Sequence, residues 1–360
     1  MNIHKIIYFL AIVGALIGQG QEQTVGLFLN TTAAAPGYTL FAPMSYNVTY
    51  LIDNNGELVQ SWPSEYGPGL SVYILENGDL LRTRRLQGQF FQTGGRGGGV
   101  EIIDWDGNLI WEFDYFSNQY WQHHDIESLP NGNILLIAWE HKTDAEAIAN
   151  GRNPILLGGS SQPFGFWPDH IIEVDPDSNS VVWEWHVWDH IIQDDDSSKA
   201  NYGVVSNHPE LVNINYPIGP NTDGGDWLHI NAVDYNAELD QIMLSVHHFG
   251  EIWIIDHSTT TAEAASHSGG NSGKGGDLLY RWGNPQAYIG GNSNERMFFG
   301  QHDARWIENG SIIMVFNNGS GRPGGSYTSV DVFTQPISEN NLYPLDSNGV
   351  YGPDSLSWQY

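Results

Sequence analysis

The sequence predicts an all-β protein of the β-propeller class. Three observations point to this fold: two kinds of hairpin alternate along the chain, one tryptophan recurs in each pair of hairpins, and glycine and tryptophan are abundant, with 42 and 14 copies. Repetition of a four-stranded antiparallel unit around an axis is what builds a propeller. We estimate six blades, with the last blade incomplete in this chain.

The first kind of hairpin has an Asn-Gly or similar polar turn between strands of alternating apolar residues. Asn-Gly in this setting is a strong hairpin signal. The segment 37–43 is expected to end one more hairpin of this kind. The complete copies cover 70–84, 122–139, 228–247 and 301–317.

The second kind of hairpin joins an apolar strand ending near Ile-Asp to a strand that carries a tryptophan. We interpret these tryptophans as structural, because large aromatic side chains suit the space between blades. The copies cover 50–62, 100–113, 170–185, 251–282 and 329–360, and their tryptophans are Trp62, Trp111, Trp183, Trp282 and Trp358.

Composition limits the possible partners and chemistry. The net charge is −29 with only 13 lysines and arginines, so nucleic acid and anionic membranes are poor partners. The absence of cysteine excludes disulfides and thiolate metal sites. Long polar insertions at 141–169, 189–227, 257–276 and 283–300 are the kind of loops that often carry function.

The N-terminus has the form of a secretory signal peptide, with a lysine, an apolar run over 6–17 and then small and polar residues. We therefore expect a signal peptide at 1–20, a single propeller domain at 25–360, and export to the periplasm or the extracellular space. A buried first strand or an uncleaved anchor is the alternative. The chain stops inside an expected strand, so we expect it to belong to a longer protein.

The histidines give the main functional clue. HHDIESLPNGNILL at 123–136 and QHDARWIENGSIIM at 301–314 are nearly copies, and the step from His124 to its turn glycine equals the step from His302 to its own. WLHINAVDYNAELDQIML repeats the plan with His229. Equivalent corners of propeller blades meet at one mouth of the central channel, so these histidines should converge.

Converging histidines can bind a metal ion, bind an anion as imidazolium, or act as nucleophile, acid and base. The simpler alternative is that each one caps or packs its own strand, and the shared register argues against it. Calcium at 175–180 or at Asp194, Asp195 and Asp196 would be structural only, and turn or loop chemistry explains these acidic residues as well.

The motifs HHDIESLPNGN, DWLHINAVDYNAELDQIMLSVHHFGEIWIIDH, LLYRWGNP and QHDARWIENGSIIMVFNNGSGR resemble those of the bacterial arylsulfate sulfotransferase family, which uses no nucleotide sulfate donor. The resemblance is strong over about 100–320. It implies an exported six-bladed propeller that moves a sulfuryl group from a phenolic sulfate to a phenol through a sulfohistidine. By motif, His302 would be the nucleophile, with His124 and His229 in support. The family's arginine falls on His247 here.

We therefore expect four catalytic histidines and four substrate-binding residues, with no metal in the reaction. The first set is His302, His124, His229 and His247, and the second is Arg281, His248, Asn231 and Arg322. Two alternatives stay open. One is an exported propeller that binds sulfated or other anionic glycans without turnover, which His247 favours. The other is a metal-dependent hydrolase with His124, His229 and His302 as ligands.

Overall fold

The computed structural model describes residues 26–157, 165–217, 225–288, 293–308, 310–338 and 341–360. The expected signal peptide at 1–20 lies outside these ranges. The chain divides into two compact units, one made of 1–41 with 49–61 and the other of 42–48 with 62–360. No helix in the described ranges is long and apolar enough to span a bilayer.

The first unit is built around a three-stranded sheet in the order β1-β2-β3. Its strands are β1 (Tyr38–Phe41), β2 (Val48–Asp53) and β3 (Leu58–Pro63), and the ends of β2 and β3 belong to the other unit. The turn between β2 and β3 is organised by the Asp53 carboxylate, which accepts the N–H groups of Asn55 and Glu57 at 2.8 and 2.9 Å. This is the hairpin expected at 50–62, extended by β1.

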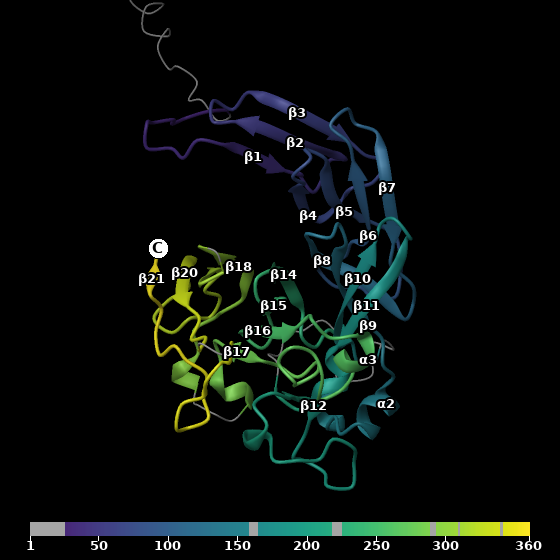
Figure 1. Ribbon diagram of the computed structural model, residues 1–360, viewed down its shortest axis with the longest axis vertical. Helices are drawn as coiled ribbons and strands as arrows, with labels where there is room; N and C mark the ends of the chain where they lie inside the picture. The colour runs from purple at the N-terminus through teal and green to yellow at the C-terminus, as the bar shows by residue number, and fades with distance from the viewer. Residues whose placement is uncertain (1–25, 158–164, 218–224, 289–292, 309, 339–340) are drawn as a thin grey trace, which may run out of the picture. The chain divides into compact units, whose positions relative to one another are not determined.

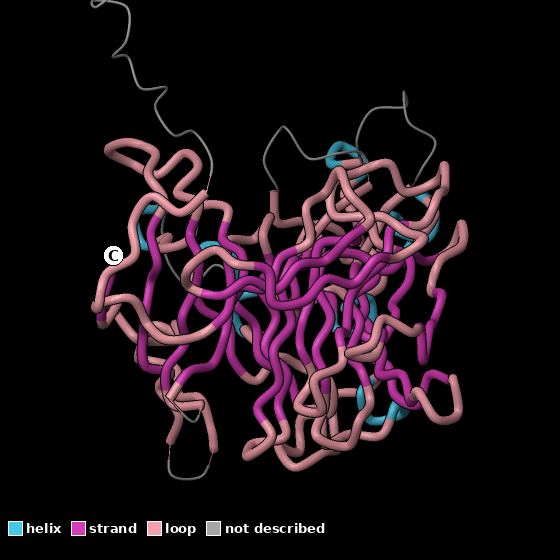
Figure 2. Tube along the Cα trace, turned by 90° about the horizontal axis from the view of Figure 1, so that it is seen from above, coloured by secondary structure: helices cyan, strands magenta, loops and turns pink. Residues whose placement is uncertain are grey.

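The second unit contains four four-stranded antiparallel sheets, each formed by strands consecutive in the chain (Figures 1 and 2). The strands are β4 (Pro68–Ile74), β5 (Leu80–Arg85), β6 (Gly98–Ile103), β7 (Leu109–Asp114), β8 (Tyr120–Ser128), β9 (Ile134–Glu140), β10 (Asp169–Asp175), β11 (Ser180–His186), β14 (Ile230–Asn236), β15 (Gln241–Val246), β16 (Glu251–Asp256), β17 (Tyr280–Trp282), β18 (Gln301–Ile307), β19 (Ile312–Asn317), β20 (Ser329–Thr334) and β21 (Trp358–Gln359).

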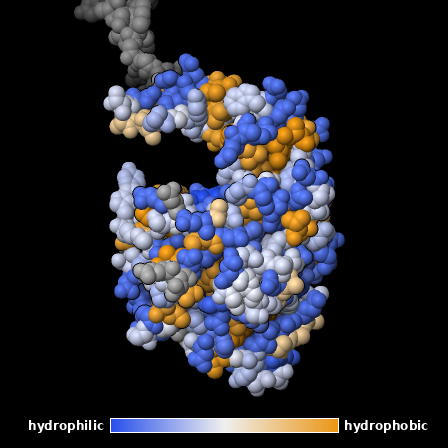
Figure 3. All heavy atoms as spheres, viewed as in Figure 1, coloured by the Kyte–Doolittle hydropathy of each residue, from blue (hydrophilic) through white to orange (hydrophobic). Residues whose placement is uncertain are grey.

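The insertions between these sheets carry short elements only. They include α2 (Asp144–Ala149), α3 (Thr261–Ala264) and a small parallel pair, β12 (Ile191–Ile192) with β13 (Val212–Asn213). Hydrophilic residues cover much of the face seen in Figure 3, as the large negative charge of the chain requires.

The propeller class is as predicted, but the blade count is not. The described residues form five blade-like sheets rather than six, and the last of them is complete, with β21 pairing β20. The sequence shows five such units, and the estimate of six added a blade expected from chain that follows Tyr360. The segment 37–43 contains β1, which pairs with β2 of the hairpin that follows it.

The recurring tryptophans join neighbouring sheets. Trp111 on β7 donates its indole N–H to Asn179 at 3.1 Å, Trp183 on β11 to Thr259 at 3.2 Å, and Trp282 on β17 to the Pro353 carbonyl at 2.8 Å. Each acceptor belongs to the next sheet or its loops. The structural interpretation of these residues therefore holds for these three, whereas Trp358 is exposed.

The acidic segments considered for calcium are used in their own turns. Asp175 accepts hydrogen bonds from the Asp177 N–H at 2.9 Å and the Ser178 hydroxyl at 2.7 Å, and Asp196 accepts from the Ser198 N–H at 2.9 Å. These are turns in which the acidic side chain caps the backbone. Calcium binding stays a prediction.

The first strand of each four-stranded sheet begins irregularly. β4, β8, β14 and β18 contact one another in chain order, and each has a register shift near its start. At each start one non-glycine residue has a left-handed φ: Leu70 at 117°, His124 at 50°, His229 at 55° and Asp303 at 47°. Bulges and strained φ values change the direction in which side chains point. Because these four strands contact one another, their irregular starts lie close together.

His257 links the second and third four-stranded sheets, away from the irregular starts of these first strands. His257 places Nε2 2.9 Å from Glu173 on β10 and Nδ1 2.7 Å from Asp240 in the β14–β15 turn. Burial lowers the pKa of His257, but its hydrogen bonds to Glu173 and Asp240 outweigh burial and raise it. The protonated imidazole therefore stabilises this junction.

We expect the stabilisation from His257 to depend on pH. Because the pKa of His257 is raised on folding, its contribution is complete below about pH 6.5, the usual value for histidine, and is lost as pH rises through the folded pKa. The free energy of unfolding, measured by urea titration at several pH values, should differ between the wild type and His257→Gln most at low pH. A difference that does not change with pH would contradict this.

Candidate active site

The four first strands surround a cavity of about 560 Å³ in the second unit. Every one of these strands contributes to its wall, which is formed by Leu70, Ser71, Val72, Tyr73, His124, Asp125, Asn231, His302, Asp303 and Arg305. A second cavity, of about 420 Å³ and lined in part by Trp282 and Tyr351, has no histidine in its wall. The chemistry expected from the sequence therefore belongs to the first cavity.

The structure brings the four expected catalytic histidines together. Ring centroids are 4.5 Å apart for His124 and His229, 5.3 Å for His229 and His247, and 5.3 Å for His247 and His302. His248 stacks on His229 at 5.0 Å. Five imidazoles thus form one continuous cluster beside the cavity, which is the convergence that the sequence predicts.

The strand pairing shows how β8 and β18 correspond. The last paired residue before the bulge is Gln122 in β8 and His302 in β18, and pairing resumes at Ile126 and at Arg305, respectively. Three residues are unpaired between these points in β8, and two are unpaired in β18. Ile126 and Arg305 each stand two residues before the last pair of their hairpin, so the two strands are compared by counting back from these two residues.

On this comparison the sequence register is off by one residue. His302 occupies the position of His123, and Asp303 occupies that of His124, with φ values of 47° and 50°. The repeats match in sequence with His124 opposite His302 because the β18–β19 turn, 308–311, is one residue shorter than the β8–β9 turn, 129–133. Both His124 and His302 nevertheless line the cavity.

His229 is held by a buried carboxylate that the sequence did not single out. Asp226 accepts the His229 Nδ1–H at 2.5 Å, the Trp139 indole N–H at 3.0 Å and the Thr93 hydroxyl at 3.2 Å. Burial alone raises the pKa of Asp226, but the charge and hydrogen bond of His229 outweigh it and lower that pKa. Asp226 is therefore an ionised acceptor, and His229 keeps its proton on Nδ1.

His302 is held by its own backbone. Its Nδ1 lies 3.1 Å from the Gly300 carbonyl, which only accepts hydrogen bonds, so the ring proton sits on Nδ1. Within the described ranges Nε2 of His302 makes no hydrogen bond, and burial lowers the pKa of the ring. At neutral pH His302 thus offers a bare Nε2 lone pair beside the cavity.

His247 is neutral, and its ring proton is on Nε2, whereas the proton of His302 is on Nδ1. Its Nδ1 is buried without a hydrogen-bond partner, and Gly300, next to His302, packs against its Nε2. A buried N–H without an acceptor is costlier than an unused lone pair, so the proton belongs on Nε2. Burial and the neighbouring imidazoles lower the pKa of His247 to about 3, so it carries no positive charge at neutral pH.

His124 ends a buried chain of hydrogen bonds that sequence reasoning missed. Its Nδ1 lies 2.7 Å from Nδ1 of His123, and Nε2 of His123 lies 2.7 Å from the Asp169 carboxylate. His123 also stacks on Trp139 with centroids 3.8 Å apart. The adjacent histidines in HHD were the sequence signal for this chain of hydrogen bonds. Its third member, Asp169, is far away in sequence.

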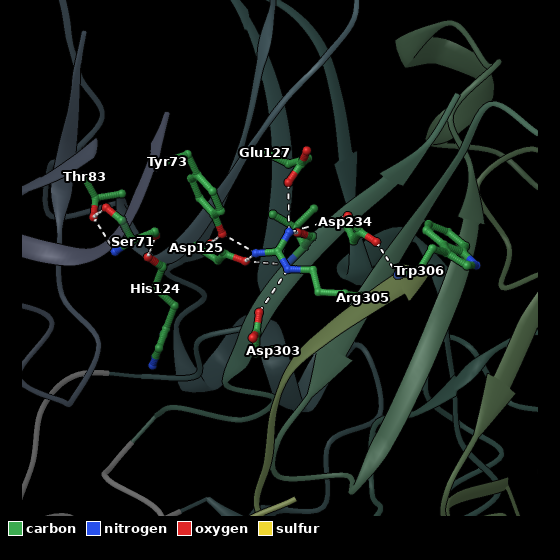
Figure 4. Close-up of polar contacts among 11 residues, drawn as sticks. Ser71, Tyr73, Thr83, His124, Asp125, Glu127, Asp234, Asp303, Arg305 and Trp306 are labelled. Atoms are coloured by element: carbon green, nitrogen blue, oxygen red, sulfur yellow. Dashed lines mark hydrogen bonds and ion pairs between the residues drawn. The ribbon is translucent and has the colours of Figure 1, made fainter. Parts of the chain in front are cut away.

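Arg305, in the QHDARW motif, is the second residue that the sequence analysis passed over. Its guanidinium lies in the cavity wall among acidic groups, 3.0 Å from Asp125, 2.9 Å from Glu127 and 3.0 Å from Asp303 (Figure 4). It also bonds the Tyr73 hydroxyl. Burial raises the pKa of Glu127 to about 8, so not every carboxylate around Arg305 is charged at neutral pH.

The four expected substrate-binding residues have different surroundings. Asn231 lines the cavity, donates to the Gln301 carbonyl at 2.8 Å and keeps a buried Oδ1 without a partner. His248 belongs to the cluster and bonds the Trp227 carbonyl through Nδ1 at 3.2 Å. Asn231 is therefore placed where a substrate could reach it, whereas His248 packs against His229 and is not part of the cavity wall.

The two arginines do not join the histidines. Arg281 is fully buried and lies over the Tyr288 ring. Its Nε is 3.1 Å from Glu251, so its positive charge is neutralised by an internal ion pair. Arg322 donates to the Ser329 hydroxyl at 2.8 Å and lies over the Tyr327 ring. The expectation that both contact substrate is not supported by these contacts.

Two groups of side chains in the described ranges have possible metal-ligand atoms within 4.8 Å of one another. They are Asp226 with His229 and His248, and His190 with His267 and Asp277, so the expected trio of His124, His229 and His302 is not among them. Asp226 and His229 already share a hydrogen bond. His190 uses both ring nitrogens, on Asp277 at 2.8 Å and on the Ala264 carbonyl at 2.8 Å. Hydrogen bonding accounts for both arrangements.

Comparison with protein families assigns the chain to one family. The model described as Arylsulfotransferase (ASST) matches residues 27–348, nearly the whole chain. This chain belongs to the arylsulfotransferase family. Membership suggests aryl sulfotransferase activity on small aryl substrates. No curated protein matches the chain.

Solved structures that resemble this arylsulfotransferase-family chain do so at low identity. Hydrazine synthase of Kuenenia stuttgartiensis is 12% identical, with 84% of this chain and 68% of that chain covered and a TM-score of 0.46. A protein of unknown function from Bacteroides caccae is 12% identical, with 90% and 93% covered and a TM-score of 0.41. The Dos1 propeller is 8% identical, with 82% and 52% covered and a TM-score of 0.36.

The packing around His124 gives a test of the site's rigidity. Gly95 has φ +87°, and a Cβ built on it would overlap the His124 ring, whereas Gly107 has φ +91° with open space around it. Both Gly→Ala changes strain the backbone alike, so their difference isolates the clash. We expect Gly95→Ala to lower the free energy of unfolding by about 1–3 kcal/mol more than Gly107→Ala does. Equal losses in urea titrations would show that His124 has room to move.

Proposed function

We propose that this protein transfers a sulfuryl group from a phenolic sulfate ester to a phenol, with His302 as the nucleophile that carries the group between them. The observation that supports this most is the bare Nε2 of His302 beside the cavity, fixed by the Nδ1 contact with Gly300 at 3.1 Å. Neutral imidazole is a good nucleophile near neutral pH, and burial keeps this one neutral.

In the first half-reaction, Nε2 of His302 attacks the sulfur of the donor. The S–N bond forms, the bond from sulfur to the aryl oxygen breaks, and the leaving oxygen takes its electron pair and a proton from a supporting histidine. The positive charge that develops on the His302 ring is stabilised through its Nδ1–H by the Gly300 carbonyl. In the second half, the acceptor phenol attacks sulfur, gives its proton to the supporting histidine and releases His302.

The sulfuryl oxygens need hydrogen-bond donors around them, as the oxygens do in phosphoryl transfer. Nε2–H of His247 is one such donor, because its neutral ring packs next to His302 with 5.3 Å between centroids. Arg305 supplies positive charge in the same cavity wall. His124 and His229 are the supporting histidines of this proposal.

We also propose that the protein acts outside the cytoplasm, in the periplasm or the extracellular space, after loss of about 20 residues. The charged and apolar start of the chain is the supporting feature. N-terminal sequencing of secreted protein tests this, and an intact Met1 on protein recovered from the cytoplasm would contradict it.

We expect His302→Ala to abolish transfer from a chromogenic aryl sulfate to added phenol, because alanine has no lone pair at that position. His124→Ala and His229→Ala should slow turnover about 10²–10⁴-fold, the usual range for an acid–base group. His208→Ala is the matched control, since His208 is half-exposed and pairs with Glu210. Wild-type turnover in His302→Ala would refute the assignment, and binding without turnover in the wild type would favour a non-catalytic propeller.

His247→Arg tests whether the donor beside His302 needs a charge. The neutral His247 donates one hydrogen bond, whereas arginine would add a fixed positive charge near the transferred group. We expect kcat for the aryl sulfate to equal or exceed that of the wild type. A fall in kcat comparable to that of His247→Ala would mean that the imidazole itself is required.

A further inference from the structure

We propose that Asp169 is the proton store of the active site, connected to the cavity through His123 and His124. The three side chains form a line of two hydrogen bonds, each 2.7 Å long. Asp169 and His123 are fully buried, while His124 at the other end lines the cavity. The line therefore joins a buried carboxylate to the place where substrate would bind.

The geometry fixes which atoms take part. His123 uses both ring nitrogens, Nε2 toward Asp169 and Nδ1 toward His124, and its ring is stacked on Trp139. The second carboxylate oxygen of Asp169 accepts the Ile230 N–H at 3.3 Å. Because these two hydrogen bonds occupy both ring nitrogens of His123, a change of protonation at one end of the line is passed to the other.

Two protonation states satisfy both hydrogen bonds. In the loaded state Asp169 is protonated and donates to His123 Nε2, His123 donates from Nδ1 to His124 Nδ1, and His124 holds its proton on Nε2. In the unloaded state Asp169 is ionised, His123 donates from Nε2, and His124 donates from Nδ1 and has a bare Nε2. The states differ by one proton, which enters or leaves at His124 Nε2.

Passage between these states needs no charged imidazole. When a proton reaches His124 Nε2, the Nδ1 proton of His124 moves to His123 Nδ1, and the Nε2 proton of His123 moves to Asp169. Only the charge of Asp169 changes. Burial raises the pKa of Asp169 well above its usual value and lowers the pKa values of His123 and His124 well below theirs, which favours the loaded state and disfavours imidazolium.

Other titratable groups that face this line belong to the same site or to the neighbouring strands. They are His229, Asp226, His247, His302, His170 and Glu140. Asp226 is held ionised by His229, as described above. Its negative charge raises the pKa of Asp169 further, and so favours storage of the proton on Asp169.

The use of this store in catalysis rests on the proposed function, but the protonation behaviour does not. In sulfuryl transfer the loaded state would give a proton to the leaving aryl oxide, and the unloaded state would take one from the acceptor phenol. Each turnover would return the line to the loaded state. Asp169 is thus a positioning and proton-storing residue, because it acts through two histidines.

Nuclear magnetic resonance of the whole, ligand-free protein tests the store. As pH rises, the ¹⁵N signals of His123 and His124 should exchange their protonated nitrogens at the same midpoint as the ¹³C carboxyl signal of Asp169, with no imidazolium signal. In Asp169→Asn this exchange should disappear. In Asp277→Asn, which alters the buried pair with His190, it should remain. An imidazolium form of His124, separate midpoints, or exchange that persists in Asp169→Asn would overturn the proposal.

A kinetic comparison then tests the use of the store. A poor leaving group needs the proton, whereas a nitrophenolate leaves without it. Asp169→Asn should therefore slow a phenyl sulfate about 10²-fold or more while slowing a nitrophenyl sulfate much less. Equal losses for both donors would reject the catalytic role. If Asp169→Asn does not fold, the coincidence of the three midpoints in the wild type decides the protonation claim, and absence of turnover in the wild type would reject the function alone.

Discussion

The cluster of imidazoles depends on one constraint, which is that a buried ring N–H must have an acceptor. Asp226 meets this need for His229, the Trp227 carbonyl for His248, and the Gly300 carbonyl for His302. All three acceptors face Nδ1. Each of these rings therefore uses Nδ1 to hold its place, and the opposite nitrogen, Nε2, is not needed for that purpose.

The backbone at the start of each inner strand makes this arrangement possible. Left-handed φ values at His124, His229 and Asp303 would be unfavourable in a regular strand, and a bulge accompanies each of them. A propeller repeats this corner from sheet to sheet. The fold can therefore bring histidines from three sheets together at the starts of strands, without placing them on long loops.

The side chains of the site carry little uncompensated charge. His247 is neutral where the family resemblance implies an arginine, and Arg305 is shared among carboxylates and Tyr73. Proton transfer through His123 to Asp169 would let His124 work without becoming a buried cation. These features agree with the proposed transfer between two phenols, in which the leaving oxygen gains a proton and the attacking oxygen loses one.

The sequence predicted the hairpins, the packing of the tryptophans and the meeting of the histidines, because periodicity and Asn-Gly turns are local signals. It misplaced the register of His302 by one residue, since a turn one residue shorter cannot be seen without strand pairing. Asp169 was missed because its partner His123 lies in another strand, whereas Asp226 was passed over although it stands three residues before His229 in the same motif. Arg281 was given a substrate role because its burial against Glu251 depends on the neighbouring strand.

Trapping of the covalent intermediate tests the central claim most directly. The protein would be mixed with an aryl sulfate but no phenol, quenched in alkali to protect an acid-labile S–N bond, digested and examined by mass spectrometry. The account predicts one sulfuryl group per chain, on the peptide that contains His302, and its loss when phenol is added before the quench. A sulfuryl group on another residue, or steady turnover with no adduct, would contradict the account.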